Sequence, residues 1–241
     1  MATATSVPPT TSPEVNYPDS DGRPMSDNTK QFRWIVTIEG GIDVLFADDP
    51  DVFVAGDLLW YPVEGDNATR TAPDVLVAFG RPKGERGSYQ QWREAGIAPQ
   101  VVFEVLSPGN RPAEITRKLG FYERYGVEEC YIYDPDWGDL TGWHRADGRW
   151  QEIPTMAGWV SPRLGVRFEL TGGELELYRP DGRRFVTYVE LSRQREQAEA
   201  QAEQARQQAE SARQQAESAR QRAERLEVRL RALGIDPDAD A

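Results

Sequence analysis

Hydrophobic and polar positions along residues 25–189 change their period several times, which predicts a domain that mixes helices with strands. Helical stretches repeat apolar side chains every three or four positions, whereas the strand-like stretches are short runs rich in Val, Leu, Ile, Trp and Tyr. The order helix, strand, strand, strand, helix, strand falls in turn on residues 29–46, 52–63, 74–79, 101–106, 113–125 and 131–133. This order predicts an α/β fold with an α-β-β-β-α-β core.

Beyond residue 133, short strands alternate with turns that are rich in glycine. We expect these strands near residues 142–145, 149–153, 165–170 and 174–178. Strands this close together along a chain pair as hairpins, so the pattern predicts an antiparallel β extension of the core.

From about Glu190 the pattern changes to a heptad repeat, in which near-identical units QQAESAR follow one another. The small and apolar residues recur at alternating spacings of four and three, at Ala198, Ala202, Ala205, Ala209, Ala212, Ala216, Ala219, Ala223, Leu226, Leu230 and Leu233. This spacing predicts a long C-terminal helix that pairs as a coiled coil, with Gly234 and Pro237 ending it. A homodimer through this coil is the favoured interpretation, and a solitary charged helix that acts as a spacer is the alternative.

Composition divides the chain into four parts. Residues 1–24 are rich in Pro, Ser, Thr and Asp and are expected to form a disordered arm, since they lack the basic and apolar regions of a signal peptide. Residues 25–189 form the globular domain, residues 190–234 the coiled-coil helix, and residues 235–241 a disordered tail. No apolar run approaches the ~18 residues of a membrane span, so we expect no membrane partner and a soluble, cytoplasmic protein.

The rare residue types exclude several kinds of chemistry. The chain has one cysteine, Cys130, and one histidine, His144, so neither a disulfide framework nor a His- or Cys-based zinc site can form within it. The net charge of −12 supplies no general basic surface for nucleic acid. Any chemistry must therefore use carboxylates, lysine, tyrosine or a hard metal ion held by oxygen atoms.

Two carboxylates and a lysine fall in unusual places within the predicted core. Asp74 opens one apolar strand, and Glu104 interrupts the next apolar run, VVFEVLS. A carboxylate inside such a run requires a cation, a hydrogen-bond network or a metal ion as compensation. Lys118 lies on the following helix, which must pack back on the sheet, so its ammonium group can reach the same edge.

The stretches APDVLVAFG and VVFEVLSPGNRPAEITRKLGFYERYGVEECYIYDP resemble the Uma-two family of endonucleases, within the PD-(D/E)xK nuclease superfamily. The resemblance spans about residues 25–153 and implies a restriction-endonuclease-like core. It implies that Asp74 and Glu104 ligate Mg²⁺ (or Mn²⁺), with the Val105 carbonyl as a further ligand. The (D/E)xK pattern places its lysine at position 106, where this chain has Leu106, so the resemblance implies that Lys118 substitutes.

The resemblance implies metal-dependent hydrolysis of phosphodiester bonds, with DNA as the expected substrate and Asp74, Glu104 and Lys118 as catalytic residues. Phosphate contacts are expected from a loop that contains Arg81, Lys83, Arg86 and Arg93, unless these residues are simply solvated. The alternative is an inactive descendant that keeps the fold as a binding module and uses the coil for protein interaction. A scaffold led by the coil is a third possibility.

Three further polar residues receive no role in this hypothesis. Gln31 and Glu39 on the first helix are expected to face solvent, and the alternative is that they add a polar group to the site. Asp57 either flanks the metal site or bonds to a nearby backbone group or arginine. The tryptophans of the β extension are expected to serve as packing, at Trp137, Trp143, Trp150 and Trp159.

Overall fold

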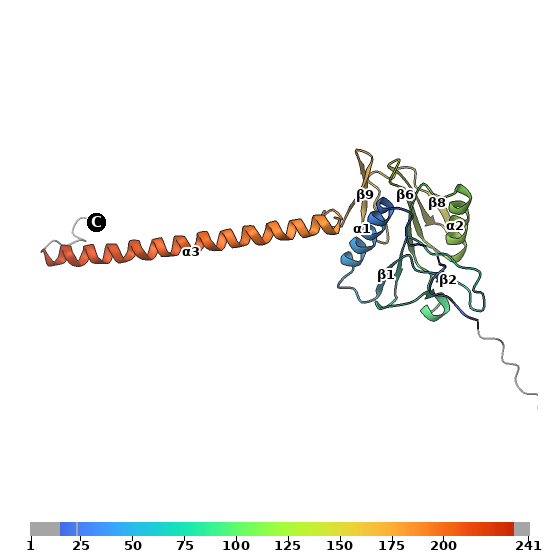
Figure 1. The fold of residues 1–241 in the computed structure, drawn as a ribbon, viewed down its shortest axis with the longest axis horizontal. Coiled ribbons are helices and arrows are strands. Elements are labelled where there is room, and N and C mark those ends of the chain that lie inside the picture. Colours follow the sequence, from blue (N-terminus) through green and yellow to red (C-terminus); the bar gives the residue numbers. More distant parts are fainter. Residues whose placement is uncertain (1–14, 23, 234–241) are drawn as a thin grey trace, which may run out of the picture. The chain divides into compact units, whose positions relative to one another are not determined.

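The computed structural model describes residues 15–22 and 24–233 of the 241-residue chain (Figure 1). The described residues divide into two compact units, one that ends at Thr187 and one that begins at Tyr188. The first unit holds the sheet and two helices, and the second holds a long helix.

The core of the first unit is a six-stranded mixed sheet with the strand order β1-β3-β5-β6-β7-β8. These strands are β1 (Val52–Gly56), β3 (Val75–Phe79), β5 (Val101–Val105), β6 (Glu129–Asp134), β7 (Asp139–Ala146) and β8 (Arg149–Glu152). The neighbours β5 and β6 are parallel, and every other pair in this sheet is antiparallel. The parallel pair is joined by a helical crossover, because parallel neighbours cannot be joined by a tight hairpin.

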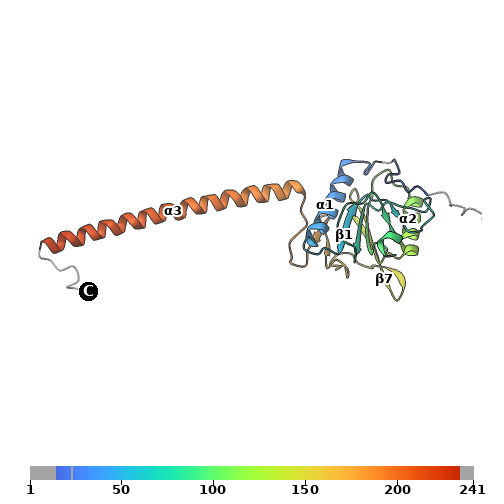
Figure 2. The same cartoon turned by 90° about the horizontal axis from the view of Figure 1, so that it is seen from below.

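Two helices cover opposite faces of this sheet, α1 (Thr29–Leu45) and α2 (Pro112–Tyr125) (Figure 2). Asn28 caps the start of α1 by accepting hydrogen bonds from the backbone N–H groups of Lys30 and Gln31. Pro112 lies at the start of α2, and Gly126 ends it in the left-handed conformation (φ 100°). The predicted α-β-β-β-α-β order is therefore confirmed by α1, β1, β3, β5, α2 and β6.

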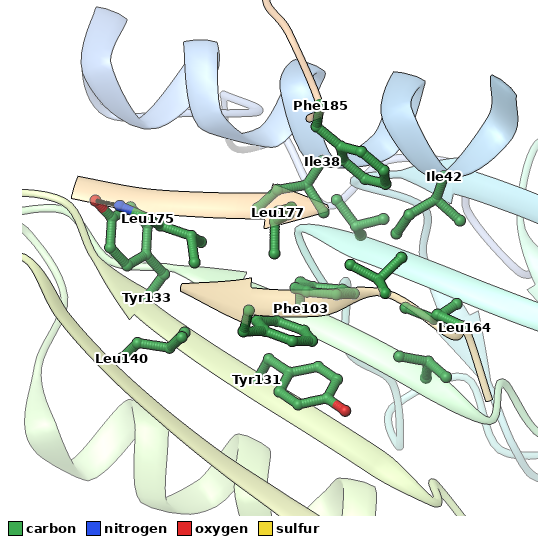
Figure 3. Packing of buried hydrophobic residues seen from close by; sticks show 14 of the residues in the cluster. Ile38, Ile42, Phe103, Tyr131, Tyr133, Leu140, Leu164, Leu175, Leu177 and Phe185 are labelled. Atoms are coloured by element: carbon green, nitrogen blue, oxygen red, sulfur yellow. Dashed lines mark hydrogen bonds between the residues drawn. The ribbon is translucent and has the colours of Figure 1, made fainter. Parts of the chain in front are cut away.

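The β extension consists of two hairpins. β7 and β8 continue the main sheet, and β9 (Arg167–Thr171) pairs with β10 (Glu174–Tyr178) in a separate antiparallel sheet. The hairpin β9–β10 packs on the α1 side, where its apolar residues meet those of α1 and the central strands (Figure 3). The predicted antiparallel extension is confirmed.

Alternation along the central strands divides the core into two clusters. Val75 and Phe103 belong to the cluster on the α1 side, whereas their neighbours Leu76 and Val102 belong to the cluster on the α2 side. Phe103 lies with Tyr131 and Leu177 in the α1-side cluster (Figure 3). Both faces of β3 and β5 are therefore buried along nearly their whole length.

α1 contains two adjacent glycines, Gly40 and Gly41, and Gly41 has a packing role. A Cβ atom at Gly41 would lie 2.2 Å from the ring of Phe185, a buried core residue. The ring of Phe185 lies against this part of α1 (Figure 3). The helix therefore uses a residue of low helix propensity because a side chain would exclude the ring.

The predicted single strand over residues 52–63 is wrong in its length. β1 ends at Gly56, Asp57 adopts a left-handed conformation (φ 46°), and the chain resumes as β2 (Trp60–Tyr61). β2 pairs in parallel with β4 (Tyr89–Gln90), which is followed by the short 3-10 helix η1 (Gln91–Glu94). The break at Asp57 turns the chain away from the main sheet.

Residues 15–22 pack against the domain, so the prediction that residues 1–24 form a disordered arm is wrong for this segment. The ring of Tyr17 packs against Tyr61 and Trp92, with centroid distances of 5.3 Å and 4.9 Å. The Tyr61 hydroxyl donates to the carbonyl of Pro18 at 2.7 Å. Residues 1–14 of this arm and the predicted tail at 235–241 lie outside the described residues.

The second unit contains the helix α3 (Tyr188–Ala232), 45 residues long, in which no residue is buried. It agrees closely with the helix expected over residues 190–234; the predicted stops Gly234 and Pro237 lie outside the described residues. In residues 15–22 and 24–233, no helix combines the length and apolar character needed to cross a membrane.

Candidate active site

Asp74 and Glu104 lie side by side at one end of the two central strands. Val75 pairs with Phe103, and continuing this antiparallel register by one residue places Asp74 opposite Glu104. Strand alternation points both residues toward the α2 side, as it does Leu76 and Val102. Asp74 is 8% exposed and Glu104 is 4% exposed, so both carboxylates are buried.

Lys118 of α2 reaches the same end of the sheet. Its Nζ atom lies 3.0 Å from Oε1 and 2.7 Å from Oε2 of Glu104, and it donates to the carbonyl of Ala72 at 3.0 Å. The convergence that was predicted for Asp74, Glu104 and Lys118 is thus present in the fold. Their chemical roles stay a prediction.

Tyr122 is a neighbour of Glu104 for which the sequence suggested no chemical role. It lies one helical turn after Lys118, and its hydroxyl donates to Oε1 of Glu104. The ring is fully buried and is stacked on Trp60 at 6.4 Å between centroids. The sequence pattern placed Tyr122 on the packed face of its helix, but it gave no sign of where the hydroxyl points.

The Asp74 carboxyl group is held between a backbone donor and another acid. Its Oδ2 atom accepts a hydrogen bond from the N–H of Val105 at 2.6 Å. Burial, followed by the Glu104 carboxylate, raises the pKa of Asp74 to about 8. A nearby cation strongly stabilises the charged form of such a buried carboxyl group.

The Lys118 side chain is partly buried next to these carboxylates, and they decide its charge. Burial lowers the pKa of Lys118, but the carboxylates of Glu104 and Asp74 raise it by more than burial lowers it. The net pKa therefore lies above the ordinary value of a lysine. Lys118 is therefore an ammonium group at neutral pH. It can donate hydrogen bonds and stabilise negative charge, but it cannot act as a general base there.

Gln31 was expected to face solvent, but its side chain is buried. It is 6% exposed, and its Nε2 atom donates to the carbonyl of Val105 at 2.7 Å. Its Oε1 atom accepts from the N–H of Asp27 at 2.8 Å. Gln31 continues the apolar stripe of Ile35 and Ile38 at a spacing of four and seven, which is the signal that could have indicated its burial.

Asp57 is in the lining of the cleft at this end of the sheet, whereas Glu39 lies on α1 outside that lining. The backbone N–H of Asp57 donates to the carbonyl of Asp74 at 3.1 Å. Burial raises the pKa of Asp57, and the Asp21 carboxylate raises it further. Glu39 is half-buried, and burial, followed by Asp43, raises its pKa, so its expected full exposure is corrected.

A cleft of about 670 Å³ opens over this end of the sheet, and Asp74 and Lys118 both line it. Glu104 lies beneath the Lys118 side chain, which is 22% exposed. The other charged residues of the lining are Asp21, Asp27, Asp57, Arg70, Glu114 and Arg117. Acidic side chains outnumber basic ones in this lining, as suits a site for a cation.

Three of the four basic residues in the loop between β3 and β5 form ion pairs with acidic side chains of the domain. Arg81 and Arg86 both pair with Glu94, at 2.9 Å and 2.7 Å, and Lys83 pairs with Asp43 at 2.9 Å. The bridges of Arg81 and Arg86 hold the loop against η1, with both arginines largely covered. None of the four basic residues of this loop is in the lining of the cleft, whereas Arg70 and Arg117 are.

The oxygen atoms at the site suit a hard divalent cation that keeps coordination positions open for water and substrate. Among the residues that the structure describes, no group of three or more His, Cys, Asp or Glu side chains is placed to hold a metal ion. Mg²⁺, however, is commonly held by one or two carboxylates, with water and substrate phosphate completing its shell. Asp74 and Glu104 supply two carboxylates, and the Val105 carbonyl lies beside them, so the residues fit this ion.

A mixed sheet with two carboxylates and a lysine at one end of its central strands, between two flanking helices, defines a restriction-endonuclease-like domain. The model of the Uma2 (Uma-two) family, which is described as "Putative restriction endonuclease", matches residues 23–172. The match covers more than half of the 241 residues, and the chain belongs to this family. The predicted family is confirmed.

Among solved structures, the chain is similar to a "putative nuclease belonging to DUF820" from Anabaena variabilis. The two are 17% identical with a TM-score of 0.42, over 56% of this chain and 72% of that chain. No curated protein matches the chain.

Proposed function

We propose that the protein is a Mg²⁺-dependent endonuclease that hydrolyses phosphodiester bonds of DNA. The observation that carries this proposal is the convergence of Asp74, Glu104 and Lys118 at one end of the sheet, where Asp74 and Lys118 line the cleft and Glu104 lies beneath Lys118. Membership of the Uma2 family supports the reaction class.

Asp74 and Glu104 would hold the ion, with the Val105 carbonyl as a third oxygen ligand. The chemistry that Mg²⁺ (or Mn²⁺) supplies when bound is the activation of water and the polarisation of a phosphate. Lys118, which is charged, would donate hydrogen bonds to a phosphate oxygen or to the attacking water. Gln31 orients the Val105 carbonyl from the opposite helix.

Arg70 and Arg117 are the cleft residues suited to bind the phosphates that flank the bond to be cut. Both line the cleft together with Lys118. Arg70 is anchored by the Tyr61 hydroxyl and the Asn67 carbonyl, at 3.4 Å and 3.2 Å. Arginine side chains bind phosphate through a planar fork of N–H groups, so these two would position the strand without reading its sequence.

The test is incubation of supercoiled plasmid with the full-length protein and Mg²⁺, together with Asp74→Ala and Glu104→Ala. Asp139→Ala, which removes an exposed acid on β7, is the matched control. Nicking by the wild type and the control that either site substitution abolishes supports the enzyme. Absence of nicking, with no Mg²⁺ binding by calorimetry, overturns it in favour of the inactive binding module, and cleavage of RNA alone corrects the substrate.

We also infer that α3 forms a homodimer, because its 45 residues include no buried side chain and its heptad seam is exposed. In a parallel pair in register, Arg222 would face Glu227 of the second copy, and Arg206, Arg213 and Arg220 would face glutamines. In an antiparallel pair centred on Arg213 the three arginines would instead face one another. Charge pairing therefore favours the parallel dimer.

A further inference from the structure

The Lys118 ammonium group has no N–H left for a substrate. An ammonium group has three donors, and Lys118 directs its hydrogen bonds to both oxygens of Glu104 and to the Ala72 carbonyl. Lys118 must therefore give up at least one of these bonds before it can contact a phosphate oxygen or a water molecule. When it does so, Glu104 loses a partner that holds its carboxylate in place.

Tyr122 holds the same carboxylate from the other side. Its hydroxyl donates to Oε1 of Glu104, and the packing around the ring holds the hydroxyl in this position. The ring is 0% exposed, is stacked nearly parallel to the ring of Trp60 (2° between the planes), and meets the ring of Phe121 edge-on. Unlike Lys118, Tyr122 is not in the lining of the cleft and has no route to substrate.

We infer that Tyr122 is a positioning residue, which keeps the Glu104 carboxylate in its ligating orientation when Lys118 turns toward a phosphate. This inference rests on the proposed function and extends it to a residue that touches neither substrate nor metal. Partners that orient a metal-binding carboxylate typically change metal affinity or activity by about 10- to 100-fold when they are removed.

The test compares Tyr122→Phe with Tyr89→Phe in the full-length protein. Tyr89 is also fully buried, but its hydroxyl donates to the Ile97 carbonyl at 2.8 Å, away from the cleft. Each variant loses one buried hydroxyl and keeps its ring, so both are expected to lower the unfolding temperature. Only Tyr122→Phe is expected to weaken Mn²⁺ binding, measured by calorimetry below the unfolding temperature, by about 10-fold or more.

Nicking provides the second measurement. Raising the Mn²⁺ concentration is expected to restore the nicking rate of Tyr122→Phe, because the ligand itself is still present, but not that of Glu104→Ala. Mn²⁺ affinity of Tyr122→Phe within twofold of the wild type overturns the inference and leaves the proposed function standing. A wild type that neither binds Mn²⁺ nor nicks DNA overturns the proposed function, and the inference falls with it.

Discussion

Replacing Asp74 by asparagine is expected to stabilise the metal-free protein at alkaline pH, although it removes a proposed ligand. Asp74 is 8% exposed, and burial beside Glu104 raises its pKa to about 8. Asparagine keeps a side-chain oxygen that can accept the hydrogen bond of the Val105 N–H. It cannot acquire the negative charge that the folded state disfavours.

The size of the effect follows from proton linkage. An unfolded aspartate has a pKa near 3.8, so between about pH 4 and pH 8 the folded wild type binds more protons than the unfolded chain. The stability of the wild type therefore falls as pH rises through this window, by at most about 1.4 kcal/mol per pH unit. The ceiling at pH 8 is on the order of 5 kcal/mol, and local relaxation reduces it to about 2 kcal/mol.

The assay is thermal unfolding followed by circular dichroism, with chelator present, at pH 5 and pH 8. A difference of about 2 kcal/mol corresponds to about 4–8 °C for a domain of this size, so Asp74→Asn should melt higher than the wild type at pH 8 by that amount. At pH 5 the gap should be much smaller, and the exposed control Asp139→Asn should show neither effect. An Asp74→Asn protein that melts below the wild type at pH 8 would refute the reasoning.

Three further predictions concern other parts of the chain. Ser161→Ala leaves the buried carboxylate of Glu129 without one of its donors, so urea unfolding should show a loss of about 1–3 kcal/mol, and a loss below about 0.5 kcal/mol would contradict this. Tyr17→Ala removes a ring packed against two others, so limited proteolysis near residues 15–22 should become faster. Tyr17→Phe keeps the ring and loses only the hydrogen bond that the hydroxyl accepts from the Gly65 N–H, so its effect should be smaller. Arg222→Glu should weaken the α3 dimer in sedimentation equilibrium, and adding Glu227→Arg to the same chain should restore it; an unchanged association constant would exclude the parallel pairing.

Most of the fold was predictable because local patterns and tertiary packing agree. Strand alternation places Asp74 and Glu104 on one face, and the helix that follows β5 must return over that face to reach β6. The position of Lys118 follows from the same reasoning. These parts of the site depend on periodicity and chain connectivity, which the amino-acid order contains directly.

Other parts depend on contacts between distant loops, which periodicity does not describe. Arg81 and Arg86 looked available for phosphate because nothing nearby in sequence indicates that η1 brings Glu94 between them. Trp137 was expected to pack in the β extension but is 86% exposed, because it falls in the turn between β6 and β7. By contrast, Trp143 and Trp150 stack across β7 and β8.

The central claim is that Asp74 and Glu104 together hold a divalent ion at the floor of the cleft. The most direct measurement is anomalous diffraction from crystals of the full-length protein grown with Mn²⁺ and a short DNA duplex. We predict one Mn²⁺ peak within about 2.0–2.3 Å of a carboxylate oxygen of each residue, with a phosphate oxygen completing the shell. Mn²⁺ bound elsewhere, or DNA bound in the cleft with Lys118 still holding Glu104 and no ion present, would contradict the claim.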